Sequence, residues 1–308
     1  MISDSPQEWR DLVWALNSPS LLGEGGCSLA AGDARESCHI DPDDVATFIG
    51  QEPTRRVGRY FERLVYFYLS RVRRADIIAS GLQIQDGTRT VGELDFVFRD
   101  DTSMDLVHWE TAVKFYLWCP ERSVEGSHLI GPNAADTFER KITRLLQHQV
   151  PLGQTKQATE QLRKTRESLA SPAEPVGIER PQSQAFVRGR IFYPAEFHKS
   201  HGDVAECAHP SQLSPGHLRG VWIKESELGQ LVELPGEWFA LVEKPYWLAP
   251  PERFDLSAAM VIDRLKTHFQ RSRSPQLLAC SLRPMLPDEV ETQHVFVMPE
   301  EWPGPTSE

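Results

Sequence analysis

The sequence predicts an α/β fold in which a helix, a three-stranded antiparallel meander and further helices are followed by an α+β second lobe. A wide apolar stripe at helical spacing runs from Arg55 to Val72, and three strand-like segments follow it as far as Trp118. Beyond residue 185 the pattern changes to short strand candidates with one helix among them. These observations together place the chain in the α/β class.

Two helices are expected before the meander. In the first, from Gln7 to Leu16, apolar residues recur three or four positions apart, and the Gly and Ser residues at 23–28 end it. The second helix covers residues 55–72, and its apolar stripe is wide enough to predict that it is largely buried. The stripe consists of Val57, Tyr60, Phe61, Leu64, Val65, Tyr68, Leu69 and Val72.

Three strands are expected next. The first runs from Ile77 to Gln85 and is followed by Asp86-Gly87, a dipeptide that supplies the positive φ angles of a tight hairpin turn. The second strand runs from Thr90 to Phe98. After a turn at 100–103, the residues from Leu106 to Trp118 form a long third strand rich in Val, Phe, Tyr and Trp.

A helical region and then a linker follow the meander. Asn133 or Asp136 can cap a helix that carries Phe138 on its apolar side, and a second helix is expected over 154–169. Residues 170–184 contain three prolines and few large apolar residues, which predicts a linker.

The linker divides the chain into two expected units. The N-terminal domain covers residues 1–169, and the C-terminal α+β lobe covers 185–308. The expected elements of this lobe are strands at 185–193, 218–224, 238–247, 276–282 and 294–297, and a helix at 257–269.

The bulk composition limits the class of protein. The 33 basic and 44 acidic residues give a formal charge of -11, which argues against nonspecific, charge-driven coating of DNA but leaves room for a local basic groove. No run approaches the roughly 18 apolar residues of a membrane span, and the first residues lack a signal-peptide pattern. The five scattered cysteines do not form a disulfide framework. We therefore expect a cytoplasmic protein that does not associate with membranes.

The third strand has one apolar face and one polar face. Side chains alternate along a strand, so Trp109, Thr111, Val113, Phe115 and Leu117 fall on one side. The other side carries His108, Glu110, Ala112, Lys114 and Tyr116. On the second strand, Gly92, Leu94, Phe96 and Phe98 fall on one side, and Glu93 and Asp95 on the other. This alternation predicts that Asp95, Glu110 and Lys114 meet on one polar face.

Such a face suits phosphodiester hydrolysis. Asp95 and Glu110 could share a divalent cation, because Mg²⁺ is held by one or two carboxylates plus water. Lys114 would then lie near the metal-bound water, where an ammonium can stabilise developing negative charge.

The order of these elements resembles the PD-(D/E)XK nuclease superfamily, whose core is a helix, a meander with Asp on one strand and an acidic residue then Lys on the next, and a following helix. This restriction-endonuclease-like resemblance implies Asp95 and Glu110 as ligands of Mg²⁺ or Mn²⁺, Lys114 as the catalytic lysine and Glu62, on the first helix, as a further ligand. The strings Gly92-Glu93-Leu94-Asp95 and His108 to Leu117 also look like a bacterial family labelled domain of unknown function 1853.

One spacing departs from the superfamily pattern. The superfamily places its acid and lysine two residues apart, whereas Glu110 and Lys114 are four apart, with Ala112 between them on the same face. This adds roughly 6 to 7 Å between the two Cα atoms at about 3.3 Å per residue. Either Glu110 is the ligand and the lysine has moved, or Ala112 marks a lost acid and the site is degenerate.

Three functional hypotheses follow. The first is a metal-dependent nuclease that binds and hydrolyses nucleic acid, either DNA or RNA. The second is a catalytically degenerate relative that binds nucleic acid or a protein partner in the same cleft. The third is an interaction protein in which Asp95, Glu110 and Lys114 form an ordinary cross-strand salt-bridge set and Glu62 pairs with Arg59 or Arg63.

Other polar clusters give weaker signals. Zinc-type residues gather in an irregular loop, but their spacing matches no zinc motif, and they are His198, His201, Cys207, His209 and His217. Cys27, Cys38 and His39 offer too few ligands for a metal. The basic stretch Lys156 to Arg166 is better explained as a solvated helix face than as a nucleic-acid groove.

Overall fold

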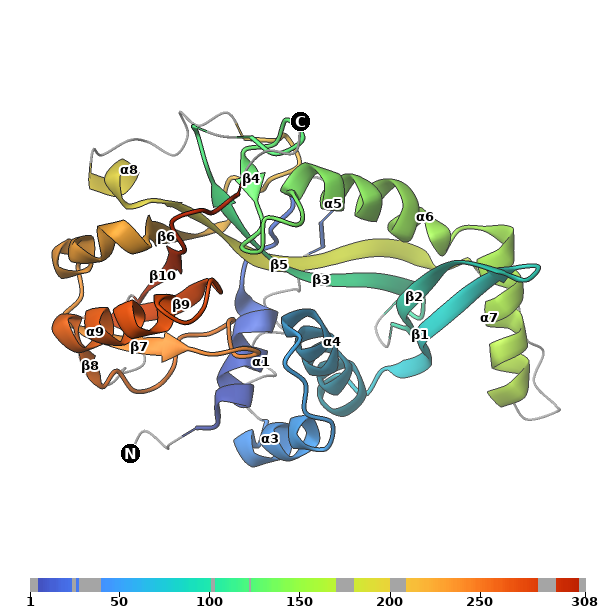
Figure 1. Ribbon diagram of the computed structural model, residues 1–308. Coiled ribbons are helices and arrows are strands. Elements are labelled where there is room, and N and C mark those ends of the chain that lie inside the picture. Colours follow the sequence, from blue (N-terminus) through green and yellow to red (C-terminus); the bar gives the residue numbers. More distant parts are fainter. Residues whose placement is uncertain are drawn as a thin grey trace.

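A ten-stranded mixed sheet runs through the protein, with helices packed on both of its faces (Figure 1). The computed structural model describes residues 5–23, 26–27, 40–100, 103–121, 123–169, 180–199, 209–281 and 292–304. In the described residues the strand order is β1-β2-β3-β5-β6-β10-β9-β7-β8, and β4 pairs with β3 outside this path. The predicted α/β class is confirmed.

The strands follow the turn signals of the sequence closely. They are β1 (Asp76–Asp86), β2 (Arg89–Arg99), β3 (Leu106–Trp118), β4 (Leu129–Ile130), β5 (Gln182–Pro194), β6 (Leu218–Lys224), β7 (Trp238–Val242), β8 (Leu256–Ser257), β9 (Gln276–Ser281) and β10 (Gln293–Met298). β7 ends five residues before the predicted end of that strand. Beyond it the chain turns, because Tyr246 N–H bonds to Glu243 O and Trp247 N–H to Pro245 O.

The helices before β5 are α1 (Gln7–Asn17), α3 (Pro42–Gly50), α4 (Val57–Phe67) with the π-helical turn η2 (Tyr68–Val72), α5 (Phe138–Arg144), the π-helical turn η3 (Leu145–Gln149), α6 (Val150–Leu152) and α7 (Lys156–Leu169). Those after it are α8 (Ala195–Lys199), the 3-10 helix η5 (Glu225–Glu233) and α9 (Ala258–Phe269). The helices α3, α8 and η5 are not among the elements that the sequence predicts. None of the helices in the described part of the chain has the length and apolar composition of a membrane span.

The predicted meander is observed, and its last pairing is short. β1 and β2 are antiparallel along their whole length and are joined at Gly87, which has a φ of 61°. β2 pairs with β3 only from Phe96 to Arg99, opposite Leu106 to Trp109. Asp95 therefore lies immediately beyond the point at which β2 and β3 separate.

The strands after the meander are mostly parallel to β3. β5 pairs with β3 in parallel, β6 with β5, and β10 with β6. The helices α5 to α7 connect β3 to β5, as a parallel connection requires. Gly189 lies opposite Lys114 in this pairing, and a Cβ atom there would come within 1.9 Å of Lys114 O.

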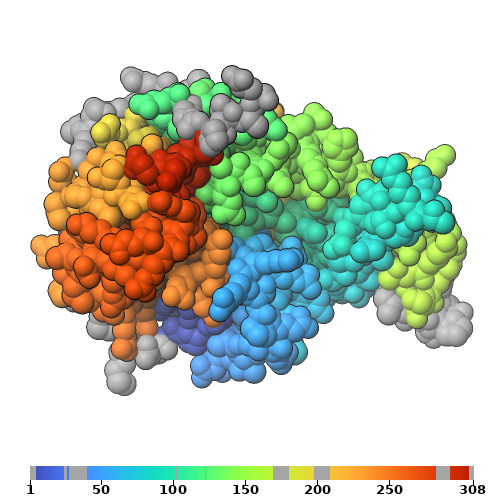
Figure 2. All heavy atoms as spheres, viewed as in Figure 1, coloured from blue at the N-terminus to red at the C-terminus, as the bar shows by residue number. Residues whose placement is uncertain are grey.

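Apolar side chains cover both faces of the sheet. The helices α1, α3 and α4 pack on one face against β3 residues such as Trp109 and Phe115. On the other face α5 and η3 pack near Tyr116, and α7 packs on β1. Figure 2 shows the helices α3 and α4, in blue, between the C-terminal part, in orange and red, and the projecting β1–β2 hairpin. Both faces of β3 are consequently buried, so its polar residues lie inside the protein.

The sheet contains strands from both predicted lobes. Most of the predicted linker, residues 170–179, lies outside the described residues, and residues 182–184 are the first residues of β5. β5 lies beside β3, in the middle of the strand order. Whether 1–169 and 185–308 are separate folding units stays a prediction.

Candidate functional site

An acidic pocket of about 290 Å³ lies between α4 and the β1–β2 hairpin. It is lined by Phe48, Gln51, Glu52, Arg59, Glu62, Arg63, Tyr66, Ser80, Gly81, Glu93, Asp95 and Phe96. Arg59 pairs with Glu62 at 3.2 Å, and Arg63 pairs with Glu52. Within the described part of the chain, Glu93 and Asp95 have no such ion pair, so the pocket carries an excess of negative charge.

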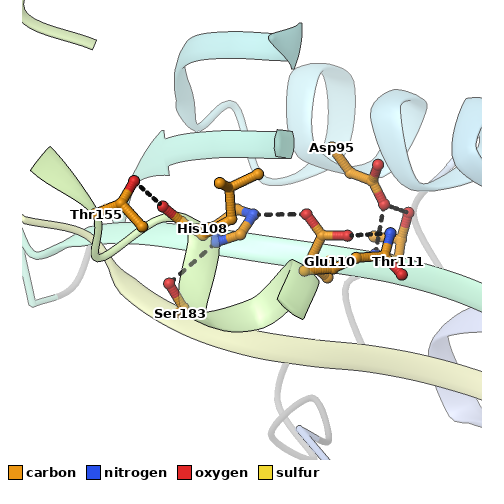
Figure 3. A network of polar contacts seen from close by, with 8 residues as sticks. Asp95, His108, Glu110, Thr111, Thr155 and Ser183 are labelled. Carbon is orange, nitrogen blue, oxygen red and sulfur yellow. Dashed lines mark hydrogen bonds and ion pairs between the residues drawn. The ribbon is translucent and has the colours of Figure 1, made fainter. Parts of the chain in front are cut away.

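Asp95 is held by the neighbouring strand. Its Oδ2 atom accepts hydrogen bonds from Thr111 N at 2.8 Å and from Thr111 Oγ1 at 3.2 Å (Figure 3). No hydrogen bond from another described residue reaches Oδ1. One oxygen of Asp95 is thus fixed by β3, and the other remains available to a ligand in the pocket.

The orientation of Asp95 differs from the simple alternation expected for β2. Leu94 packs with Ile84 on the α7 side of the sheet, whereas Phe96 packs against Tyr66 of α4. Asp95 and Phe96 both line the pocket, so successive side chains point to the same side here. The break lies beside Gly81, whose φ of 64° departs from strand geometry. Asp95 therefore contacts Thr111, which belongs to the other face of β3 from Glu110. The prediction that Asp95 and Glu110 meet on one polar face is wrong, because β2 changes its alternation at this point.

Glu110 lies at the centre of a buried hydrogen-bond chain, with 1% of its surface exposed. Its Oε1 is 3.0 Å from His108 Nε2, and its Oε2 accepts from Gln149 Nε2 at 3.2 Å. The other ring nitrogen of His108 is 3.0 Å from Ser183 Oγ. These hydrogen bonds link β5, β3 and η3, as Figure 3 shows in part, and they hold the carboxylate of Glu110 in one orientation.

The two carboxyl groups are difficult to ionise together. Burial, with the charge of Glu110, raises the pKa of Asp95 to about 7, although the Thr111 hydrogen bonds oppose the shift. Burial raises the pKa of Glu110 to about 8, and the charges of Glu93 and Glu62 add to this. Near neutral pH a bound cation would favour ionisation of both groups, because it would replace the missing positive charge.

The remaining titratable groups of the site respond mainly to burial. Burial lowers the pKa of His108 to about 4, so its contact with Glu110 joins a neutral imidazole to a carboxyl group. Burial also raises the pKa of Glu62, against the effect of the Arg59 guanidinium. Glu62 lies 35% exposed at the pocket, and its charge acts on both Asp95 and Glu110.

Lys114 lies away from the carboxylate pair. No hydrogen bond or ion pair among the described residues joins it to Asp95 or Glu110. Burial lowers the pKa of Lys114, and the nearby charges that act on it belong to Asp136, Lys141 and Glu62. The four-residue spacing has therefore carried the ammonium toward α5, and the predicted contact between this lysine and the carboxylate pair is not formed.

The donors required for a metal ion are present, although they are not gathered around one point. Within the described ranges, no group of three His, Cys, Asp or Glu side chains is arranged to hold a metal. Asp95 and Glu62 line the same pocket, however, and Mg²⁺ needs only one or two carboxylates with water. The donor chemistry of the pocket fits a hard divalent cation.

Several contacts of this site could not be read from the sequence. The alternation along β3 predicts Thr111 on the apolar face of that strand, and neither Gln149 nor Ser183 belongs to a sequence motif. Gln149 reaches Glu110 across 39 positions of sequence, and Ser183 reaches His108 across 75. Only the packing of η3 and β5 against β3 brings these side chains together.

The other polar clusters have structural partners. His217 and His209 lie 2.8 and 3.2 Å from the hydroxyl of Tyr193, while His201 and Cys207 are outside the described residues. Cys38 and His39 are outside them as well. On α7, Arg163 pairs with Glu160 and Glu167 on an exposed face, in agreement with a solvated helix.

Comparison with known families matches residues 10–298 to one family, described as a domain of unknown function (DUF1853). The chain belongs to this family. The match confirms the family resemblance noted from the Asp95 and Glu110 strings, and the family's description assigns no reaction. Comparisons with curated proteins and with solved structures found no significant match.

Proposed function

We propose that this member of the DUF1853 family is a phosphodiesterase of nucleic acid that depends on Mg²⁺ or Mn²⁺. The observation that carries the proposal is the position of Asp95 and Glu110. They lie on adjacent strands, where β2 separates from β3, and their charges interact beside an acidic pocket.

The order of elements supports the same function. The helix α4 precedes the antiparallel meander β1 to β3, and helices α5 to α7 follow it. This is the order expected from the resemblance to the PD-(D/E)XK nuclease superfamily. The acidic residues lie on the second and third strands of the meander, as that resemblance implies.

Each residue of the site has a distinct task under this proposal. Asp95 and Glu62 offer carboxylates to the cation from the pocket. Glu110, on the opposite face of β3, acts on the site through its charge, which raises the pKa of Asp95. When bound, the cation would polarise a phosphate oxygen and lower the pKa of a water molecule. Thr111 orients Asp95 through two hydrogen bonds.

Two positively charged side chains also line the pocket. The guanidinium groups of Arg59 and Arg63 line it and form ion pairs with Glu62 and Glu52. Arginine matches the geometry of a phosphate group, so these side chains can bind a phosphodiester backbone if they exchange partners. They act as the binding part of the site, and the carboxylates act as its reactive part.

A second candidate is a catalytically inactive nuclease-fold protein that binds nucleic acid or a protein partner. Two observations favour it. No hydrogen bond or ion pair among the described residues joins Lys114 to Asp95 or Glu110, and the charges that act on it belong to other residues. Both oxygens of Glu110 are already engaged in hydrogen bonds, with His108 and Gln149. A metal at Glu110 would have to compete with these contacts.

A hydrolysis assay separates the two candidates. Single- and double-stranded DNA and RNA would be incubated with Mg²⁺ or Mn²⁺ and either wild type, Asp95→Asn or Asp263→Asn. The last variant is the matched control, because it makes the same substitution at an exposed carboxylate on α9, outside the pocket. We expect metal-dependent cleavage by wild type and the control, and a loss of at least roughly a hundredfold in Asp95→Asn. Equal cleavage by Asp95→Asn would refute the proposal, and binding without cleavage by wild type would favour the second candidate.

A further inference from the structure

A second cavity, of about 540 Å³, lies at the carboxyl ends of the parallel strands and shares no residue with the acidic pocket. It is lined by Trp118, Cys119, Pro120, Glu121, Pro194, Ala195, Glu196, Phe197, Trp222, Lys224, Glu227, Gln230, Trp302 and Pro303. In α/β sheets, ligands bind preferentially outside the carboxyl ends of the strands. The position of the cavity therefore suggests a binding site.

The lining comes from the ends of β3, β5 and β6 and from the segments that follow β5, β6 and β10. β3 ends at Trp118, and β5 runs directly into α8, which can be followed in Figure 1. β6 ends at Lys224 and is followed by η5, while the segment after β10 supplies Trp302. The cavity is consequently built by segments from distant parts of the sequence, which the sheet holds in a common place.

Aromatic rings form much of its wall. The rings of Trp118 and Phe197 meet edge to face at 5.2 Å, and those of Trp222 and Trp302 at 5.4 Å. The indole N–H groups of Trp222 and Trp302 donate to backbone oxygens, at 2.9 and 3.4 Å respectively. Since these polar groups are already engaged, the two rings offer a ligand mainly carbon and π surface.

The charge of the lining is negative. The lining includes three carboxylates, those of Glu121, Glu196 and Glu227, and one ammonium, that of Lys224. Glu227 accepts a hydrogen bond from Lys224 N at 2.7 Å, and Lys224 Nζ lies 3.8 Å from Glu300. Glu121 and Glu196 are exposed and form no ion pair with a described residue. The cavity thus lacks the positive charge that would balance its carboxylates.

We propose that this cavity binds an organic cation that carries N–H donors on an apolar stem, either a guanidinium or a primary ammonium. Aromatic faces attract such cations, and the carboxylates balance their charge and accept hydrogen bonds from their N–H groups. The three carboxylates disfavour phosphate-bearing ligands. The cation belongs either to a small molecule or to an arginine or lysine side chain of a peptide, because both present the same chemistry.

Calorimetric titration with butylguanidinium and its neutral analogue butylurea tests the proposal. The two molecules have similar shape and differ in charge, so the cavity should bind the first and not the second. The double variant Glu121→Gln, Glu196→Gln should bind butylguanidinium at least about tenfold more weakly. The matched control, Asp86→Asn with Asp263→Asn, neutralises two exposed carboxylates elsewhere and should bind as wild type does.

A single change in the wall provides an independent check. Phe197→Leu keeps an apolar side chain on the half-buried helix α8 but removes an aromatic face, and should also weaken binding. N-acetylarginine amide, with the neutral N-acetylcitrulline amide as its control, separates the two sources of the cation. Tighter binding of the arginine derivative than of butylguanidinium indicates a peptide side chain, and tighter binding of butylguanidinium indicates a small molecule. No binding of butylguanidinium by wild type, equal binding of butylurea, or unchanged affinity in the double variant would overturn the proposal.

Discussion

Replacing Asp11 by Asn should make the protein more stable above neutral pH. Asp11 is fully buried on α1. Its Oδ2 accepts a hydrogen bond from Tyr60 Oη, and its Oδ1 accepts one from Ala249 N, both at 2.8 Å. It therefore joins α1 to α4 and to the segment after β7. Burial raises the pKa of this carboxyl group from 3.8 to about 7, although these hydrogen bonds oppose the shift.

The sign and size of the effect follow from linkage. Between pH 4 and 7 the folded protein keeps a proton on Asp11 that the unfolded chain has lost, so stability falls as the pH rises. At 1.36 kcal/mol per pKa unit, a shift of about three units corresponds to roughly 4 kcal/mol. With an unfolding entropy of about 2.1 cal/mol/K per residue, this equals about 6 °C in Tm for a chain of 308 residues. Asn does not titrate, so Asp11→Asn avoids this loss.

Thermal unfolding of wild type and Asp11→Asn at intervals from pH 4 to pH 8.5 measures the difference. The Tm of the variant relative to wild type should rise through this range and level off above pH 7. Asp263→Asn, an exposed carboxylate on α9, should show no comparable trend. A Tm difference for Asp11→Asn that does not change with pH would show that Asp11 ionises normally in the fold, and the reasoning from burial would be wrong.

Two further predictions concern the strands around the site. Gly189→Ala should destabilise the fold by about 3 kcal/mol or more and lower the soluble yield and Tm, because its Cβ would meet Lys114 O at 1.9 Å. Gly216→Ala, whose Cβ would meet nothing closer than Ser214 Oγ at 3.9 Å, should leave both unchanged. Thr111→Val removes the hydroxyl donor to Asp95 but keeps the backbone N–H donor, so urea titration should show a free energy of unfolding lower by about 1 kcal/mol. An unchanged urea midpoint would mean that the hydroxyl contact does not stabilise the fold.

The strands and most helices could be predicted because their signals are local. Asp86-Gly87 identified the first hairpin, and the alternation of apolar and polar residues identified β3, whose observed bounds match the prediction. The helix α3 has an equally local signal, since Asp41 accepts a hydrogen bond from Asp43 N and Pro42 follows the cap. It was missed because its apolar pattern is only nine residues long.

The candidate site was predictable only in outline. The alternation of apolar and polar residues along β3 predicts the polar position of Glu110. Because β2 and β3 are consecutive strands of the meander, the sequence also predicts that Asp95 and Glu110 lie on neighbouring strands. The alternation of β2 breaks at Asp95, and a period of two residues cannot reveal such a break. The displacement of Lys114 toward Asp136, and the contact of Gln149 with Glu110, depend on how α5 and η3 pack on the sheet. These are tertiary contacts without a local pattern.

Calorimetric titration with Mn²⁺ tests the central claim, that Asp95 forms part of a divalent-metal site beside the buried carboxyl group of Glu110. At pH 6.5 both carboxyl groups retain protons, since their pKa values are raised to about 7 and about 8. We predict that wild type and the control Asp263→Asn bind Mn²⁺ and release protons, which appears as a binding enthalpy that depends on the buffer. Asp95→Asn should bind Mn²⁺ at least roughly a hundredfold more weakly. If wild type binds no Mn²⁺ at millimolar concentration, or if Asp95→Asn binds it as wild type does, the claim is contradicted.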